Sequence, residues 1–155
     1  MTPTYLPYDP DTVHRLRAGG PDAYGNPAER LRSDGAGNPC RSCLDYVPEG
    51  AAMLVAAARP FAALQPYAET GPIFLCAACA PWTGTGRPPV LTGSATYLVK
   101  GYDKRERIVY GSGRIVAQAD VDTYVGHLLA QDGIAFVDLR SASNNCFITR
   151  AFAPT

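Results

Sequence analysis

Two pairs of cysteines constrain this chain more than any other feature of its sequence. Cys40 and Cys43 form one CxxC pair, Cys76 and Cys79 form the other, and residues 44–75 separate them. Two intervening residues let the chain turn tightly, so that both thiolates of a pair reach one ion, and two such corners complete a tetrahedron with Zn–S distances of about 2.3 Å. Four thiolates suit zinc and fill its coordination shell, which favours a structural role. The sequence therefore predicts a structural zinc ion bound by these four cysteines.

Three alternative roles for the cysteines remain open. A redox CxxC motif needs a strand before it and a helix start after it, because the helix N-terminus lowers the thiol pKa; Cys76 follows an expected strand, but Pro81 limits any helix there. Structural disulfides are disfavoured in a reducing compartment, and cysteines are also common as buried apolar residues. The separation between the pairs exceeds the usual spacing of about 15–20 residues. Neither His14 nor His127 is expected to act as a ligand, since each lies off the apolar stripe of its helix.

Length and charge restrict the remaining classes of protein. The chain has 155 residues, about the size of one domain, and we expect residues 1–155 to form a single domain. Lys and Arg number 14, as do Asp and Glu, so no basic surplus favours a nucleic-acid partner. The N-terminus lacks the charged and apolar regions of a signal peptide, and no apolar stretch approaches the roughly 18 residues of a membrane span. A cytoplasmic protein without a membrane or nucleic-acid partner is predicted.

The pattern of apolar residues predicts an α+β domain with a mostly antiparallel sheet, two short helices and a four-cysteine zinc corner. Helices are expected at 10–19 and 119–131, and an irregular loop at 20–39. Strands are expected at 51–58, 71–75, 95–102, 107–117, 134–140 and 146–152. Strands followed by a helix and further strands argue against a regular βαβ array.

The last two expected strands form a hairpin that carries several polar residues. If residues 141–145 are the loop, Arg140 lies opposite Cys146 and Asp138 lies opposite Ile148. Because side chains alternate between the two faces, one face then carries Asp138, Arg140, Cys146 and Arg150. Such a face is able to bind a small anion through an arginine fork. The alternative is a half-exposed hairpin with a cross-strand ion pair. Cys146 is either a nucleophile, which needs a nearby base, or a packed thiol.

A second polar segment, residues 59–72, leads into the second cysteine pair. Arg59, Tyr67 and Glu69 are candidates for lining a pocket, and equally for bracing a loop beside the metal. With Arg140 and Arg150 they make the predicted ligand-binding set. Two function classes stay open: a zinc-stabilised binding or interaction domain, and a small enzyme acting on an anionic small molecule through Arg59, Tyr67, Glu69, Arg140 and Cys146. The chain has no Walker A, HExxH, EF-hand or GxSxG motif, and its reaction, if it has one, and its oligomeric state are not predicted.

Several segments together resemble a bacterial domain-of-unknown-function family, number 1203. The segments are Asp22-Ala23-x-Gly25-Asn26-Pro27, Pro39-Cys40-Arg41-x-Cys43, Arg59-Pro60-Phe61, Tyr67 to Phe74, and Cys146-Phe147. The resemblance covers nearly the whole chain and implies a bacterial cytosolic protein, without implying a reaction. In the family the position of Cys76 is commonly a histidine, and this exchange is chemically natural at a zinc ligand.

Overall fold

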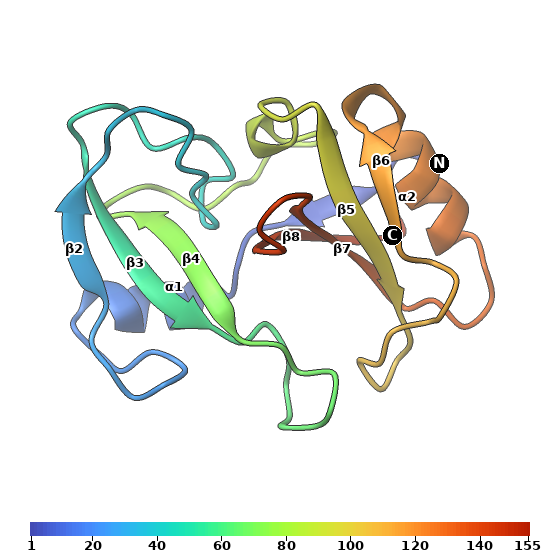
Figure 1. Ribbon diagram of the computed structural model, residues 1–155, viewed down its shortest axis with the longest axis horizontal. Helices are drawn as coiled ribbons and strands as arrows, with labels where there is room; N and C mark the ends of the chain where they lie inside the picture. The colour runs from blue at the N-terminus through green and yellow to red at the C-terminus, as the bar shows by residue number, and fades with distance from the viewer.

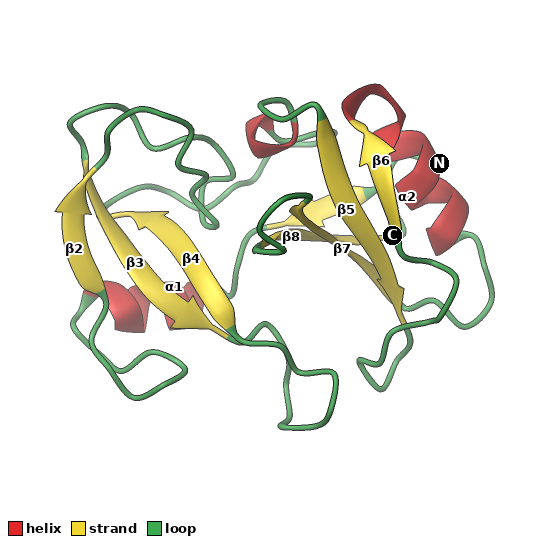
Figure 2. Ribbon diagram, viewed as in Figure 1, coloured by secondary structure: helices red, strands yellow, loops and turns green.

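The computed structural model describes residues 1–155. It contains two α-helices and eight strands, which confirms the predicted α+β class with mostly antiparallel pairing. The helices are α1 (Pro10–Arg17) and α2 (Val121–Leu129); the strands are β1 (Thr4–Leu6), β2 (Glu29–Arg32), β3 (Ala52–Ala58), β4 (Gly71–Cys76), β5 (Thr96–Tyr102), β6 (Arg114–Ala117), β7 (Phe136–Ser141) and β8 (Phe147–Phe152). The strands form two separate sheets (Figures 1 and 2).

The smaller sheet has the order β2-β3-β4, and α1 packs on one of its faces. Strand periodicity places Leu54 and Ala56 of β3 on the face that meets Val13 and Leu16 of α1, and all four side chains are buried. Asp9 caps α1, because its carboxylate accepts a hydrogen bond from the backbone N–H of Thr12 at 3.1 Å. The small sheet and α1 therefore share a core of their own.

The larger sheet has the order β1-β8-β7-β5-β6, and α2 covers one of its faces. Val125 and Leu128 of α2 belong to the same buried cluster as Val99 of β5 and Val137 and Leu139 of β7. The strand residues between these point the other way, since side chains alternate along a strand. The face away from α2 therefore carries a buried polar row.

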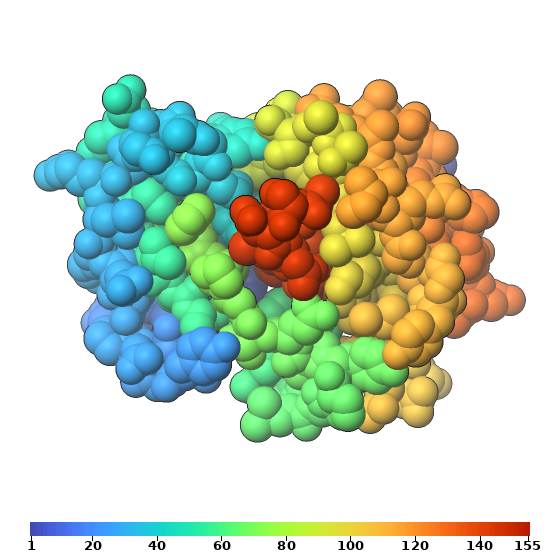
Figure 3. All heavy atoms as spheres, in the orientation of Figure 1, coloured from blue at the N-terminus to red at the C-terminus, as the bar shows by residue number.

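The two sheets lie beside each other with the β7–β8 connection between them. This connection, coloured red, reaches the centre of the face shown in Figure 3, beside the segment around residue 70. Asn145 of the connection and Pro72 of β4 line the same small pocket, which confirms that the segments are neighbours.

Several details differ from the predictions. Strand β1 was not expected, and the strands are divided between two sheets where one sheet was expected. The expected loop at 20–39 contains β2, whose four residues are all exposed, so it lacks the buried alternation that identifies a strand. The strand expected at 107–117 is confined to β6. Before it, Ile108 forms only an isolated bridge with Tyr102, and the chain turns at Tyr110 and Gly111, where Gly111 has a φ of 92°.

The register of the C-terminal hairpin also differs. Asp138 pairs with Arg150 and Arg140 pairs with Phe147, with an irregularity between Leu139 and Arg140. The extra residue on β8 shifts the pairing, so that neither Cys146 nor Ile148 takes its predicted place.

Neither helix combines the length and the apolar composition that crossing a bilayer requires.

Candidate functional site

The first cysteine corner is attached to the strand that carries the second. The backbone N–H of Arg41 donates to the carbonyl oxygen of Phe74 in β4 at 3.0 Å, two residues before Cys76. After Cys43 the chain reverses at Leu44, whose φ of 55° is unusual for a residue with a side chain. The Leu44 N–H donates to the Cys40 carbonyl at 3.0 Å and closes the turn. These contacts bring the two corners together at the end of β4.

All four sulfur atoms of Cys40, Cys43, Cys76 and Cys79 lie within 4.8 Å of one another. The Sγ atoms of Cys40 and Cys79 are 3.8 Å apart, and those of Cys43 and Cys76 are 4.0 Å apart. Sulfurs at the corners of a tetrahedron with metal–sulfur bonds of about 2.3 Å are roughly 3.8 Å apart. A disulfide requires about 2.05 Å, and all five cysteines of the chain are free. The donor set and its spacing therefore fit a tetrahedral ion such as zinc.

Hydrogen bonds from nitrogen atoms surround the sulfur cluster. The backbone N–H groups of Cys76 and Ser42 donate to Sγ of Cys40 at 3.2 and 3.4 Å. Arg17, in the last turn of α1, donates from Nη2 to Sγ of Cys79 at 3.0 Å and from Nε to the carbonyl of Cys76 at 3.1 Å. Such donors orient metal ligands and offset their negative charge.

Contacts between the cysteines, together with burial, shift the pKa values of Cys40, Cys43 and Cys76 in different directions. A hydrogen bond from Cys43, together with backbone N–H groups, lowers the pKa of Cys40 to about 4 despite burial. The same contact with Cys40 is the main cause that raises the pKa of Cys43. Burial raises the pKa of Cys76 to about 12. A divalent cation bound by all four sulfurs would favour the thiolate form of each and release protons on binding.

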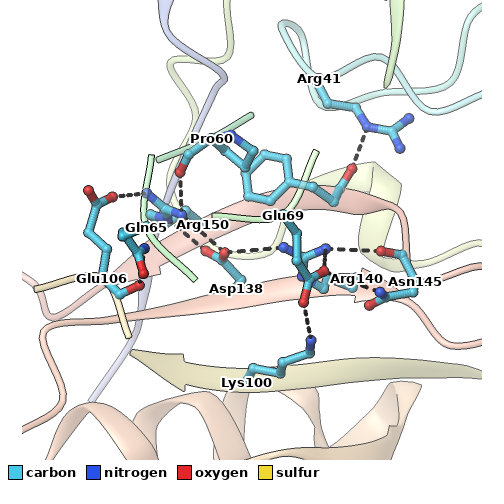
Figure 4. A network of polar contacts seen from close by, with 11 residues as sticks. Arg41, Pro60, Gln65, Glu69, Lys100, Glu106, Asp138, Arg140, Asn145 and Arg150 are labelled. Carbon is cyan, nitrogen blue, oxygen red and sulfur yellow. Dashed lines mark hydrogen bonds and ion pairs between the residues drawn. The ribbon is translucent and has the colours of Figure 1, made fainter. Parts of the chain in front are cut away.

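The buried polar row of the larger sheet belongs to a second cluster of polar side chains (Figure 4). Arg150 donates from Nε and Nη2 to the fully buried carboxylate of Asp138, at 2.7 and 3.1 Å. Arg140 lies 4.0 Å from the same carboxylate and forms an ion pair with Glu69 at 3.2 Å. Lys100 approaches Glu69 at 3.4 Å. Each of these acids has a basic partner, and the full burial of Asp138 raises the cost of breaking its pair with Arg150.

The five residues predicted to bind a ligand are divided between separate places. Arg59 and Arg150 line a pocket of about 410 Å³. Glu69 and Arg140 line a smaller pocket of about 170 Å³, together with Cys146. Tyr67 lines neither and instead shares a hydrogen bond of 2.7 Å with the hydroxyl of Tyr110.

Arg17 and Arg41 also contribute to the cysteine site, although neither was among the residues predicted from the sequence. Arg41 lies inside the first CxxC pair, and its Nε atom donates to the carbonyl oxygen of Phe147 in β8 at 2.7 Å. Its position between Cys40 and Cys43 could have identified it from the sequence as a residue of the site. Arg17 gives no such signal, because α1 and the second cysteine pair are far apart in the chain.

Comparison with known proteins identifies the family. A family model described as "Protein of unknown function (DUF1203)" matches residues 37–151, which include all the cysteines and the polar row. No curated protein and no solved structure matches the chain. The matched residues make up well over half of the chain and extend from the first cysteine corner to β8. The chain belongs to the DUF1203 family of proteins.

Proposed function

We propose that this chain is a non-catalytic binding domain whose fold is stabilised by a structural zinc ion held by Cys40, Cys43, Cys76 and Cys79. The observation that carries the proposal is the convergence of four sulfur atoms within 4.8 Å. Four thiolates leave no coordination position for a substrate or an activated water, which distinguishes structural from catalytic zinc.

The surroundings of Cys146 support binding rather than covalent catalysis. A cysteine nucleophile needs a base within hydrogen-bond reach, and the pocket that Cys146 lines includes no histidine. His127 lines a different pocket, beside α2, and His14 lies on the exposed side of α1. The Cys146 thiol instead contacts the carbonyl oxygen of Asn144 at 3.7 Å.

The position of the sulfur cluster accounts for the way in which an ion would stabilise the fold. One pair of ligands precedes β3, and the other lies at the end of β4 and just after it. The start of β3 and the end of β4 are adjacent, so an ion would fasten the segment before β3 to this end of the antiparallel pair. Metal binding of this kind contributes directly to the free energy of folding.

The test combines elemental analysis with thermal unfolding. We expect one zinc ion per chain in the purified protein, identified by X-ray fluorescence. Cys40→Ser and Cys79→Ser should each lose the ion and unfold at a clearly lower temperature, where about 1 kcal/mol corresponds to roughly 2–4 °C in a domain of this size. Cys146→Ser is the matched control and should keep both the ion and the melting temperature. Protein without metal, with Cys40→Ser unfolding like the parent, would contradict the proposal.

A further inference from the structure

The pocket of about 410 Å³ beside Arg59, called here the Arg59 pocket, is formed by three parts of the chain. They are the residues around the start of α1, the segment that follows β3, and β8, and Glu106 of the β5–β6 connection adds one further side chain. Its walls include four aromatic side chains, those of Tyr8, Phe61, Phe147 and Phe152. Its volume lies in the range of about 300–1,000 Å³ that small-molecule sites occupy, near the lower end.

Arg59 is the charged group in this wall that has no partner. Its guanidinium forms no ion pair with any acid of the chain, and its Nε atom is buried without a hydrogen-bond acceptor. A buried donor without an acceptor is costly, and more so when it is charged. The site is therefore incomplete without an acceptor supplied from outside the chain.

The other charged groups in the wall are already occupied. Arg150 binds the carboxylate of Asp138 at 2.7 Å. Asp9 accepts hydrogen bonds from Thr12 at the start of α1, and Glu106 accepts from the backbone N–H of Ala62 at 2.8 Å. Glu106 also forms an ion pair with Arg150 at 3.8 Å. Arg59 is therefore the basic side chain of the wall that no acid pairs with, and it is the group left to receive the negative end of a ligand. The nearby carboxylates of Asp9 and Glu106 disfavour a doubly charged ligand such as phosphate.

The segment that carries Arg59 is held in place before any ligand arrives. Arg150 donates from Nη2 to the carbonyl oxygen of Pro60 at 2.8 Å, as Figure 4 shows. The same arginine lies over the ring of Phe61, with its Cζ atom 5.3 Å from the ring centre. A preformed site loses less conformational entropy on binding. Burial, followed by the charge of Asp9, raises the pKa of Tyr8, so the hydroxyl of Tyr8 keeps its proton at neutral pH.

We infer that the Arg59 pocket binds a small monocarboxylic acid with an aromatic or aliphatic body. The guanidinium of Arg59 receives the carboxylate, because its planar fork matches that group, and the aromatic walls receive the apolar body. This inference rests on the proposed binding function and names its ligand class and its site.

The test uses the full-length, zinc-containing protein and phenylacetate as the probe. On titration, nuclear magnetic resonance should show shifts at the backbone amides of Phe61, Ala62 and Phe147 and at the Nε–H signal of Arg59. Phenylacetamide, which has the same shape without the charge, should bind roughly tenfold more weakly or worse, as should the variant Arg59→Gln, because a hydrogen bond to a charged group is lost. Arg105→Gln alters an exposed arginine and should bind phenylacetate like the parent. Inorganic phosphate should not shift these signals.

Two outcomes would overturn the inference: no shifts in the pocket, or equal affinity for phenylacetate and phenylacetamide. Both are measured on the parent protein, so they remain decisive if Arg59→Gln fails to fold. The zinc content of the same samples separates this inference from the proposed function. Zinc-containing protein that does not bind phenylacetate refutes the ligand and leaves the metal-stabilised domain standing, whereas protein that never contains zinc refutes the metal proposal whatever the titration shows.

Discussion

The guanidinium of Arg41 donates from Nε to the carbonyl oxygen of Phe147 at 2.7 Å, and this bond joins the two sheets. Arg41 stands between the first two cysteines, and Phe147 is the first residue of β8 in the larger sheet. The Nη1 atom of Arg41 also donates to the carbonyl of Pro39 at 2.6 Å. Burial lowers the pKa of Arg41 to about 10, so the side chain stays charged at neutral pH. The cysteine corner and the larger sheet are therefore linked through one buried cation.

Replacing this cation should destabilise the protein without removing the metal. Arg41→Met leaves two carbonyl oxygens without their charged donor, and we expect a loss of about 3 kcal/mol in the free energy of unfolding. Urea denaturation followed by circular dichroism measures this loss, and elemental analysis should show an unchanged zinc content. Arg105→Met, at an exposed arginine, is the control and should change stability by less than about 0.5 kcal/mol. Equal stability of Arg41→Met and the parent would mean that the sheets are joined by other contacts.

Arg17 is expected to tune the affinity for the metal. A site of four thiolates around a divalent ion carries a net negative charge, and the guanidinium of Arg17 lies 3.0 Å from one of its sulfurs. Arg17→Gln should therefore weaken zinc binding by roughly 10–100-fold, measured by competition with a chromophoric chelator. Arg15→Gln, on an exposed position of the same helix, is the matched control. A variant that binds zinc as tightly as the parent would show that the contact with Cys79 has no role in the site.

Asp138 is expected to be the most sensitive acid of the chain. Its carboxylate is fully buried and neutralises Arg150, with Arg140 also nearby. Asp138→Asn removes the carboxylate that Arg150 binds most closely and leaves it only Glu106, 3.8 Å away, so a loss of about 3–5 kcal/mol is expected in urea denaturation. Asp132→Asn, at an exposed site, should be nearly neutral.

A double-variant cycle separates the ion pair from general damage at this position. Asp138→Asn combined with Arg150→Gln should reduce the free energy of unfolding by less than the sum of the two single changes. In the double variant neither charge of the pair is left buried without its partner. Strictly additive losses would argue that the two side chains act independently.

Glu69 should make stability depend on pH in the acid range. Burial raises its pKa, but the charges of Arg140 and Lys100 outweigh this effect, and the net pKa lies below the usual 4.5. Since the folded pKa is below the unfolded one, the contribution is complete above about pH 4.5 and is lost as the pH falls through the folded pKa. The Glu69 side chain is 38% exposed, so solvent screening keeps the contribution below about 1 kcal/mol.

The measurement is the difference in unfolding free energy between the parent and Glu69→Gln, determined from pH 7 to pH 3. The parent should be more stable at pH 7, and the difference should shrink towards the acid end. Glu49→Gln, at an exposed acid, should show no such trend. A difference that grows on acidification would reverse the assigned direction of the pKa shift.

The cysteine pairs and the longer elements follow from local sequence. The spacing of a CxxC pair by itself predicts a tight turn that brings its two sulfurs together. A four-sulfur site then required only that the two turns lie close to each other. Short apolar runs were enough for β3 and β4, β-branched and aromatic residues for β5, and spacing of three and four residues was enough for α2. These signals are strong because each element buries one side along its whole length.

Other features were decided only by the tertiary structure. β2 forms because β3 offers it an edge, and its exposed side chains carry no sign of this in the sequence. One irregular step between β7 and β8 sets Arg150, rather than Ile148, opposite Asp138. Arg59, which follows β3, and Arg140, in β7, line different pockets. Local pattern determines most of the helices and strands, but edge strands such as β2, strand register and the contacts between sheets depend on long-range packing, which no short segment encodes.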